Sequence, residues 1–187
     1  MLKLKFLILL FFVNTSFSQT IYESFESKFL NDSRELKIQL PRNYDDNPKK
    51  NYPLIIVLDG DYMFEAVSGN VDYLSYWGTI PESIIVGINQ IGSRFNDCGV
   101  LDNIDFIPIS SSANFFDFIS EELIPFFDKN YRTTKFKVAV GHESTANYIN
   151  YFLLNNKTSV SGFISISPKF SYNMENYLIK RFDKVKS

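Results

Sequence analysis

Residues 137–154, KVAVGHESTANYINYFLL, constrain the fold more than any other stretch of this chain. An apolar run at 138–140 stops at Gly141, and from Ala146 onward apolar residues recur at spacings of three and four. This pattern predicts a strand, a tight turn and a helix. In an α/β protein such a turn holds a nucleophile above the carboxyl edge of the sheet, so its residues decide much of the function. Three residues after the strand, the chain has Glu143 rather than a serine.

The composition suits one globular domain with ample material for a core. The chain has 187 residues, a formal net charge of -2, 45% hydrophobic residues and 17% aromatic residues. A mildly acidic chain without a basic stripe gives no support for nucleic-acid binding. Cys98 is the only cysteine, which excludes an internal disulfide and a thiolate zinc site. We expect Cys98 to be a partly buried, small apolar side chain, with pairing to another chain as the alternative.

The first 18 residues have the pattern of a signal peptide. Lys3 and Lys5 precede an apolar run at 6–13, and the small residues Ser16 and Ser18 follow it. Because this run is too short to span a bilayer, we expect cleavage after Ser18 and no transmembrane helix in the mature chain. The product is expected to be exported, to the periplasm or the extracellular space, with residues 19–187 forming a single α/β domain.

The rest of the chain alternates between strand patterns and helix patterns. Strands are predicted at residues 20–30, 33–40, 53–58, 83–88 and 162–166. Helices are predicted at residues 62–77, 115–130 and 174–182. The first strand is expected at the sheet edge, the second to be antiparallel, and Pro125 to kink or end its helix. Residues 89–114 read as a long polar loop. This order predicts parallel pairing, right-handed crossovers and a three-layer α/β sandwich.

The predicted strand at 53–58 ends in the acidic triplet Asp59-Gly60-Asp61. Acidic residues at the carboxyl end of a strand can bind a cation, but one triplet without further spaced ligands is weak evidence for a metal site. A turn with helix-capping roles is the better interpretation. We therefore expect neither a metal nor a cofactor.

Five blocks of the chain resemble, in the same order, the esterase family of the α/β-hydrolase superfamily that contains esterase D and the enterochelin esterases. The blocks are YPLIIVLDGDYMF, IPESIIVGINQIGSRFND, FFDFISEELIPFFDKNYRT, VAVGHESTANYINYFLL and GFISISP. The resemblance runs from about Ser33 to Ser171 and implies an α/β-hydrolase-like, mostly parallel sheet.

The resemblance also implies a domain that is truncated at its C-terminus. The family's sheet continues after the strand at 162–166 with two more strands, which bear an acid and a histidine, whereas residues 169–187 have room for one helix. Either the reading frame has been cut short, or another chain, such as a second copy, covers the open sheet edge.

The turn itself departs from the family's pattern. Members are expected to carry Gly-His-Ser-x-Gly-Gly, with the serine as nucleophile, where this chain has GHESTA at 141–146. Aligned without a gap, Glu143 takes the nucleophile's position. A shift by one residue would make Ser144 the nucleophile, but it would put the imidazole of His142 where the turn has room for almost no side chain.

The resemblance implies a histidine base beyond the last strands, and this chain has no histidine after His142. A serine hydroxyl needs such a base, oriented by a carboxylate. The side chain of His142 is expected to point into the sheet. Glu143 could itself form an ester intermediate, but hydrolysis of that intermediate also requires a histidine. The carboxylate would instead face the oxyanion donors, namely the N–H of Ser144 and one from loop 60–62.

The function predicted from the sequence is therefore an exported esterase-like protein with an impaired or inactive catalytic site. It would bind a small ester, a siderophore-like compound or a protein partner. Two alternatives stay open: a carboxylic-ester hydrolase with residual activity through Ser144 or Glu143, and a non-enzymatic binding protein or truncated remnant. The cleft is expected to be lined by Asp59, Gly60, Asp61, Tyr62, Arg94 and His142.

Overall fold

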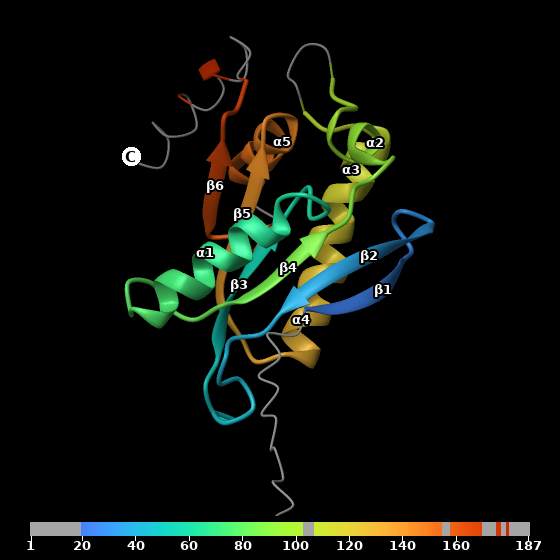
Figure 1. The fold of residues 1–187 in the computed structure, drawn as a ribbon. Helices are drawn as coiled ribbons and strands as arrows, with labels where there is room; N and C mark the ends of the chain where they lie inside the picture. Colours follow the sequence, from blue (N-terminus) through green and yellow to red (C-terminus); the bar gives the residue numbers. More distant parts are fainter. Residues whose placement is uncertain (1–19, 103–106, 155–157, 170–174, 177–178, 180–187) are drawn as a thin grey trace, which may run out of the picture.

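A computed structural model describes residues 20–102, 107–154, 158–169, 175–176 and 179. These residues form a six-stranded sheet in the order β1-β2-β4-β3-β5-β6, with helices on both faces (Figure 1). The predicted signal peptide and most of the predicted helix at 174–182 lie outside the described residues. In the described part of the chain, no helix has the length and apolar character needed to cross a bilayer.

The strands confirm the predicted mostly parallel sheet. They are β1 (Ile21–Ser27), β2 (Asp32–Gln39), β3 (Tyr52–Val57), β4 (Ile84–Ile88), β5 (Thr133–His142) and β6 (Gly162–Ile166). An antiparallel hairpin of β1 and β2 pairs with β4, also antiparallel, and leaves β1 at the edge, as predicted. The four remaining strands are parallel to one another. Strands β3 and β4 read as continuous apolar runs because both of their faces are covered.

The helices form two layers, one on each face of the sheet (Figure 1). They are α1 (Phe64–Tyr76), α2 (Arg94–Cys98), α3 (Ser110–Asp117), the π-helical turn η1 (Phe118–Leu123), α4 (Ile124–Asn130) and α5 (Ser144–Leu154). Helix α1 packs over a small apolar cluster that includes Val57, Phe64 and Val140. Helices α3, α4 and α5, with η1, pack over the larger cluster on the opposite face. The predicted three-layer sandwich is therefore confirmed.

The middle of the chain contradicts one prediction and narrows another. The segment at 89–114, predicted as a loop, contains α2 and the start of α3. Helix α2 has no apolar periodicity because it is one short turn that buries the polar Asp97 beside Cys98. Of the two outcomes predicted for Pro125, an end of the helix is not seen, since α4 continues past it, and the π turn η1, a typical site of helix kinks, comes directly before it. Such a turn gives room for the proline ring and for the missing N–H donor.

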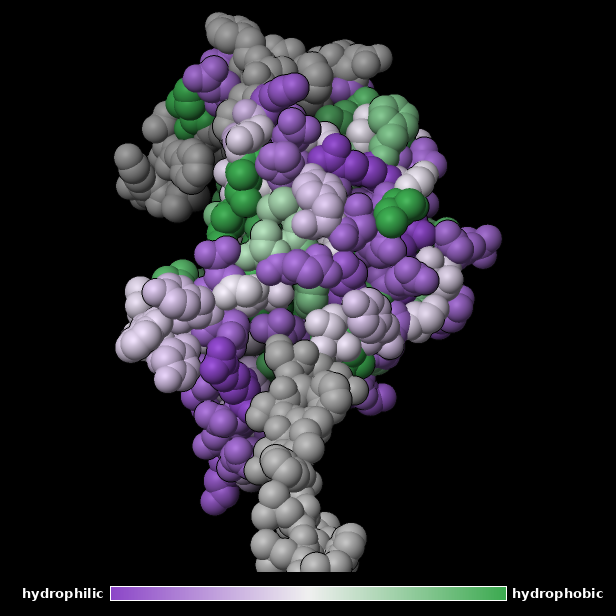
Figure 2. Space-filling model, in the orientation of Figure 1, coloured by the Kyte–Doolittle hydropathy of each residue, from purple (hydrophilic) through white to green (hydrophobic). Residues whose placement is uncertain are grey.

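The face that carries α1 is covered only in part. Figure 2 shows apolar side chains exposed in the hollow beside α1, over β5 and β6. Phe136 and Ile164 are 51% and 48% exposed, and they follow the same alternation as Val138 and Ile166, which pack toward α1. In the described part of the chain, this side of β6 is therefore open.

Candidate active-site region

Glu143 occupies the apex of the turn between β5 and α5. It is the single residue between His142 and Ser144, which belong to the strand and the helix, and its φ is 53°. Its N–H donates to the carbonyl of Ile166 at 2.9 Å, and its side chain is exposed. A residue with a Cβ is uncommon in this left-handed conformation, which is typical of strained functional turns. The structure thus places Glu143 at the apex and Ser144 as the first residue of the helix.

The turn is tight because the strand and the helix nearly touch at Gly141. A Cβ at Gly141 would lie 2.6 Å from the backbone of Thr145. Thr145 and Ala146, which stand where the family has glycines, are both fully buried. The helix therefore starts close against the strand, and only glycine fits at position 141.

A buried charged cluster lies directly beneath this turn. Asp59 follows β3 and is 1% exposed. Its carboxylate accepts hydrogen bonds from Nε and Nη2 of Arg94, at 2.6 and 3.0 Å, and from the hydroxyl of Thr145 at 2.7 Å. The hydrogen bond to Asp59 raises the pKa of Arg94. This buried carboxylate is fully paired, and the Thr145 hydroxyl fills the space that a glycine would leave.

The side chain of His142 does not point into the sheet, contrary to the prediction. Its Nδ1 lies 2.9 Å from the hydroxyl of Tyr62, and the imidazole is partly exposed. Because His142 is the last residue of β5, its side chain passes the end of the sheet and meets the loop that leads into α1. Within the described part of the chain, no hydrogen bond joins His142 to Ser144.

In the described part of the chain, backbone N–H groups without an acceptor lie in loop 60–62 and at the start of α5. In loop 60–62, the N–H of Gly60 donates to the carbonyl of Ile88 at 2.8 Å, and that of Tyr62 donates to the carbonyl of Asp59 at 3.1 Å. This leaves the N–H of Asp61, and that of Ser144, without an acceptor among the described residues. These two groups are the remaining candidates for the predicted oxyanion donors.

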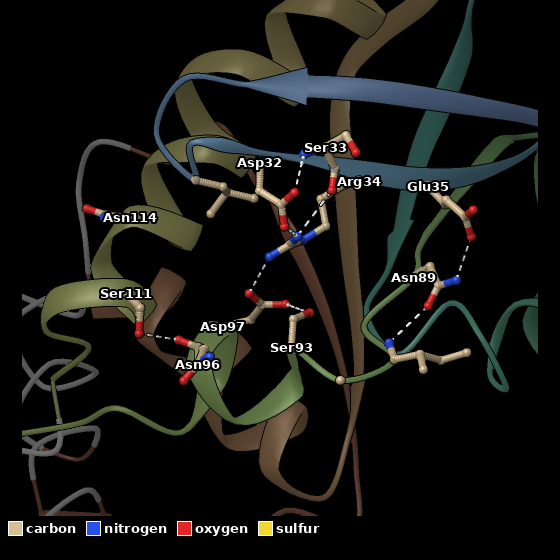
Figure 3. A pocket seen from close by; sticks show the side chains of 13 residues that line it. Asp32, Ser33, Arg34, Glu35, Asn89, Ser93, Asn96, Asp97, Ser111 and Asn114 are labelled. Atoms are coloured by element: carbon tan, nitrogen blue, oxygen red, sulfur yellow. Dashed lines mark hydrogen bonds and ion pairs between the residues drawn. The ribbon is translucent and has the colours of Figure 1, made fainter.

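The six residues predicted to line a cleft differ in exposure. Asp59 and Gly60 are buried, whereas Asp61, Tyr62, Arg94 and His142 reach the surface. None of the six lines the cavity of about 780 Å³ that lies beside them, between the β1–β2 hairpin, α2 and α3 (Figure 3). That cavity is lined by Leu30, Asp32, Ser33, Arg34, Glu35, Asn89, Ile91, Gly92, Ser93, Asn96, Asp97, Ser111 and Asn114.

Arg34 is the central charged group of this cavity (Figure 3). It pairs with Asp32 at 2.9 Å and with Asp97 at 3.0 Å, and its Nε is buried without a hydrogen-bond partner. The side chain of Gln90 connects the cavity to the apex region, since it accepts from the N–H of Asp59 at 2.8 Å and donates to Asp97 at 3.1 Å. The sequence carried no local signal for the contacts of Arg34 with Asp97 and of Gln90 with Asp59, because these partners are 63 and 31 positions apart in the chain.

Cys98 is buried, with Sγ 3.4 Å from the amide nitrogen of Gln90. Burial raises the pKa of its thiol well above the ordinary value, so the thiol stays protonated. In the part of the chain that the structure describes, no group of three or more His, Cys, Asp or Glu side chains could hold a metal ion.

The comparisons with known proteins agree on the fold. Among solved structures, the chain is similar to an uncharacterised protein from Capnocytophaga ochracea, with 29% identity and a TM-score of 0.79 over 87% of this chain and 44% of that one. It is similar to an IroE-like serine hydrolase from Shewanella oneidensis, with 24% identity and a TM-score of 0.74 over 89% and 56% of the two chains. It is also similar to the enterobactin esterase FES from Shigella flexneri, with 17% identity and a TM-score of 0.68 over 90% and 42%.

This chain spans about half the length of these structures. No curated protein matches it. The sequence pattern of the family described as Putative esterase matches residues 27–169, which include β2 to β6 and the whole apex region. With that match over most of its length and an α/β-hydrolase-like sheet, the chain belongs to the Putative esterase family.

Proposed function

We propose that this chain is an exported member of the esterase family that binds a small ester or siderophore-like ligand and does not carry out acyl transfer through a serine. The observation that carries the proposal is the apex, where the residue with φ of 53° is Glu143. A carboxylate at this position cannot take the role of an alcohol nucleophile. The comparisons support the esterase-like fold, and the sequence pattern of residues 1–18 supports export.

The surroundings of Ser144 argue against a shifted mechanism. Ser144 is exposed and starts α5, and its hydroxyl has no hydrogen bond to a base in the described part of the chain. A serine hydroxyl becomes nucleophilic only when a base in hydrogen-bond reach removes its proton. The N–H of Ser144 has no acceptor among the described residues, so the apex offers a donor for a transition-state oxygen but no hydroxyl that is bonded to a base.

The cavity beside Arg34 supports ligand binding. Its volume of about 780 Å³ lies in the range of small-molecule pockets, which is roughly 300–1,000 Å³. Its lining offers the guanidinium of Arg34, carboxylates and amide side chains such as Asn89 and Asn96, which suit a ligand with many polar oxygens. The structural similarity to the enterobactin esterase FES and to the siderophore hydrolase EstA from Aspergillus nidulans makes siderophore esters the first class to test.

The test combines covalent labelling with binding. We expect a fluorophosphonate probe to leave the purified protein unlabelled, while a catecholate siderophore ester binds in isothermal titration calorimetry and binds more weakly to Arg34→Gln. A Glu143→Ser variant should regain little labelling, because no hydrogen bond joins a base to residue 143 in the described part of the chain and the imidazole of His142 is bonded to Tyr62 instead. If the parent protein were labelled and Ser144→Ala abolished that labelling, the proposal would be overturned in favour of a serine esterase. If the parent protein did not bind the siderophore ester, the proposal that this chain binds such a ligand would be wrong.

We also propose that a second copy of this chain covers the open side of β6. The exposed Phe136 and Ile164 on the sheet face beside α1 support an apolar interface there, and the backbone edge of β6 next to them, which is unpaired among the described residues, can pair with another chain. Light scattering should then give the mass of a dimer, and Ile164→Lys should give a monomer. A monomeric parent protein would contradict this assembly.

A further inference from the structure

The imidazole of His142 lies in a chain of hydrogen bonds that starts at the buried carboxylate of Asp59. The hydroxyl of Tyr62 is 3.2 Å from Oδ2 of Asp59 and 2.9 Å from Nδ1 of His142. The two rings meet edge to face, with centroids 6.0 Å apart and an angle of 78°. His142 is also the only histidine of the chain, and it stands directly before the apex.

The position of one proton decides which nitrogen of His142 is available. A phenol hydroxyl has a single proton. Nη2 of Arg94, at 3.5 Å, can only donate to the phenol oxygen, and Oδ2 of Asp59, at 3.2 Å, can only accept from it, whereas Nδ1 of His142 can do either. We therefore assign the proton of Tyr62 to the hydrogen bond with Asp59. Burial and the charge of Asp59 raise the pKa of Tyr62, so this hydroxyl keeps its proton.

The phenol oxygen of Tyr62 can then only accept from the imidazole. It follows that Nδ1 of His142 carries a proton and that Nε2 presents its lone pair. In the described part of the chain, Nε2 has no hydrogen-bond partner, and the side chain is partly exposed. A histidine held in one tautomer by a carboxylate, here through a tyrosine, is arranged as a general base.

The rest of the cluster keeps this arrangement in place. Arg94 and Thr145 fix the carboxylate of Asp59 with three hydrogen bonds. Arg94 also donates to the carbonyl of His142 at 3.0 Å, which holds the backbone of the last residue of β5. The relay from Asp59 through Tyr62 to His142 is thus held at both its ends.

We propose that Nε2 of His142 is a general base that activates water against activated esters bound at the apex, with Tyr62 and Asp59 as its positioning residues. The inference rests on the proposed function for the class of ligand, but it adds an activity that needs neither Glu143 nor Ser144 as a nucleophile. It also supplies the base that sequence reasoning found missing.

The step balances with water as the only co-reactant. Nε2 takes a proton from water as the water oxygen forms its bond to the acyl carbon, and the carbonyl electron pair moves to the carbonyl oxygen. The unpaired N–H of Ser144 can donate to that oxygen. Collapse of the tetrahedral intermediate breaks the bond to the leaving group, which departs as p-nitrophenolate when a p-nitrophenyl ester is used. The imidazolium proton then passes to solvent.

The first experiment measures hydrolysis of p-nitrophenyl acetate. We expect slow turnover above the buffer rate, linear from the first turnover without a burst, and about 100-fold slower in His142→Gln, the lower end of what a positioned base contributes. Free imidazole should restore turnover to His142→Ala above the rate that the same imidazole concentration gives without protein, which a purely structural role of His142 would not allow. Equal rates for the parent protein and His142→Gln, or turnover no faster than buffer, would overturn the inference.

The second experiment tests Tyr62 as a positioning residue. Tyr62→Phe keeps the ring but removes the phenol oxygen that accepts from the imidazole of His142. We therefore expect kcat to fall about tenfold with KM nearly unchanged, because the imidazole would lose the hydrogen bond that orients it. Tyr73→Phe makes the same change at an exposed tyrosine of α1 and should leave both constants unchanged. An unchanged kcat in Tyr62→Phe would mean that Tyr62 and Asp59 do not position His142 for turnover.

These outcomes are distinct from a failure of the proposed function. A serine mechanism would show fluorophosphonate labelling, a burst of p-nitrophenolate and loss of turnover in Ser144→Ala. The water mechanism shows none of these, and its turnover is lost in His142→Gln instead. Loss of ligand binding, in turn, would be measured by calorimetry without any turnover.

Discussion

The apex at Glu143 and the cavity beside Arg34 lie close together in the fold, but they are packed in opposite ways. Beneath the apex, Asp59 and Thr145 are 1% and 0% exposed and are bonded to each other. At the cavity, by contrast, polar side chains line an open space of about 780 Å³ (Figure 3). Because the region under the apex is already filled, a ligand can be held beside the apex or above it but not beneath it.

The largest effect is expected from removing the carboxylate under the apex. Asp59→Ala leaves Arg94 and Thr145 without their shared acceptor, and loss of one partner of a buried ion pair costs about 3–5 kcal/mol. Because Arg94 is 36% exposed, we expect a loss of about 3 kcal/mol in the free energy of unfolding, measured by urea denaturation. The control is Asp45→Ala in an exposed turn, and equal losses in the two variants would contradict the packing described for the apex.

A methyl group at the turn should give the next largest effect. In Gly141→Ala the new Cβ would meet the backbone of Thr145, which cannot move aside as a flexible side chain can. Overpacking of this kind costs about 1–3 kcal/mol. Gly69→Ala is the matched control, since Gly69 has open space around it in α1 and alanine should stabilise that helix by about 0.5–1 kcal/mol. In thermal unfolding, the melting temperature should fall in Gly141→Ala and rise slightly in Gly69→Ala. An unchanged melting temperature for Gly141→Ala would mean that the turn is looser than described.

The hydroxyl of Thr145 provides a smaller test of the same region. Thr145→Val keeps the shape but removes one donor to Asp59 and the acceptor for the N–H of His142, which lies at 2.8 Å. We expect a loss of about 1–2 kcal/mol in urea denaturation, because buried polar groups are left unpaired. Thr145→Ser keeps the hydroxyl and should recover most of the difference. If valine were tolerated as well as serine, the hydroxyl would have no structural role at the apex.

The same comparison separates what the sequence could predict from what it could not. Strands β3 and β4 and helix α5 were predictable because apolar runs and periods reflect which faces are buried, and Glu143 at the apex followed from aligning 141–146 without a gap. Helix α2 was missed because a single turn has no measurable period. The contacts of Asp59 with Thr145 and of Tyr62 with His142 join residues 86 and 80 positions apart. No local pattern encodes such contacts, since they depend on how the loops meet above the sheet.

The smallest effect is expected for an ion pair that links β2 to α1 beside loop 60–62. Lys37 donates to the carbonyl of Asp61 at 3.2 Å and to the carboxylate of Glu65 at 2.6 Å, but the side chain of Glu65 is 62% exposed. Solvent screens such pairs, so Glu65→Gln should lower the free energy of unfolding by no more than about 0.5 kcal/mol near neutral pH.

The pH dependence of this pair has a definite sign. The hydrogen bond from Lys37 lowers the pKa of Glu65 in the folded protein. A carboxyl whose folded pKa is lowered adds stability above its unfolded pKa, and that stability is lost as the pH falls through the folded pKa. The difference between the parent protein and Glu65→Gln in urea denaturation should therefore disappear in acid. A difference that grew on acidification would contradict the lowered pKa of Glu65, and one as large as that of Asp59→Ala would mean that solvent does not screen the exposed pair.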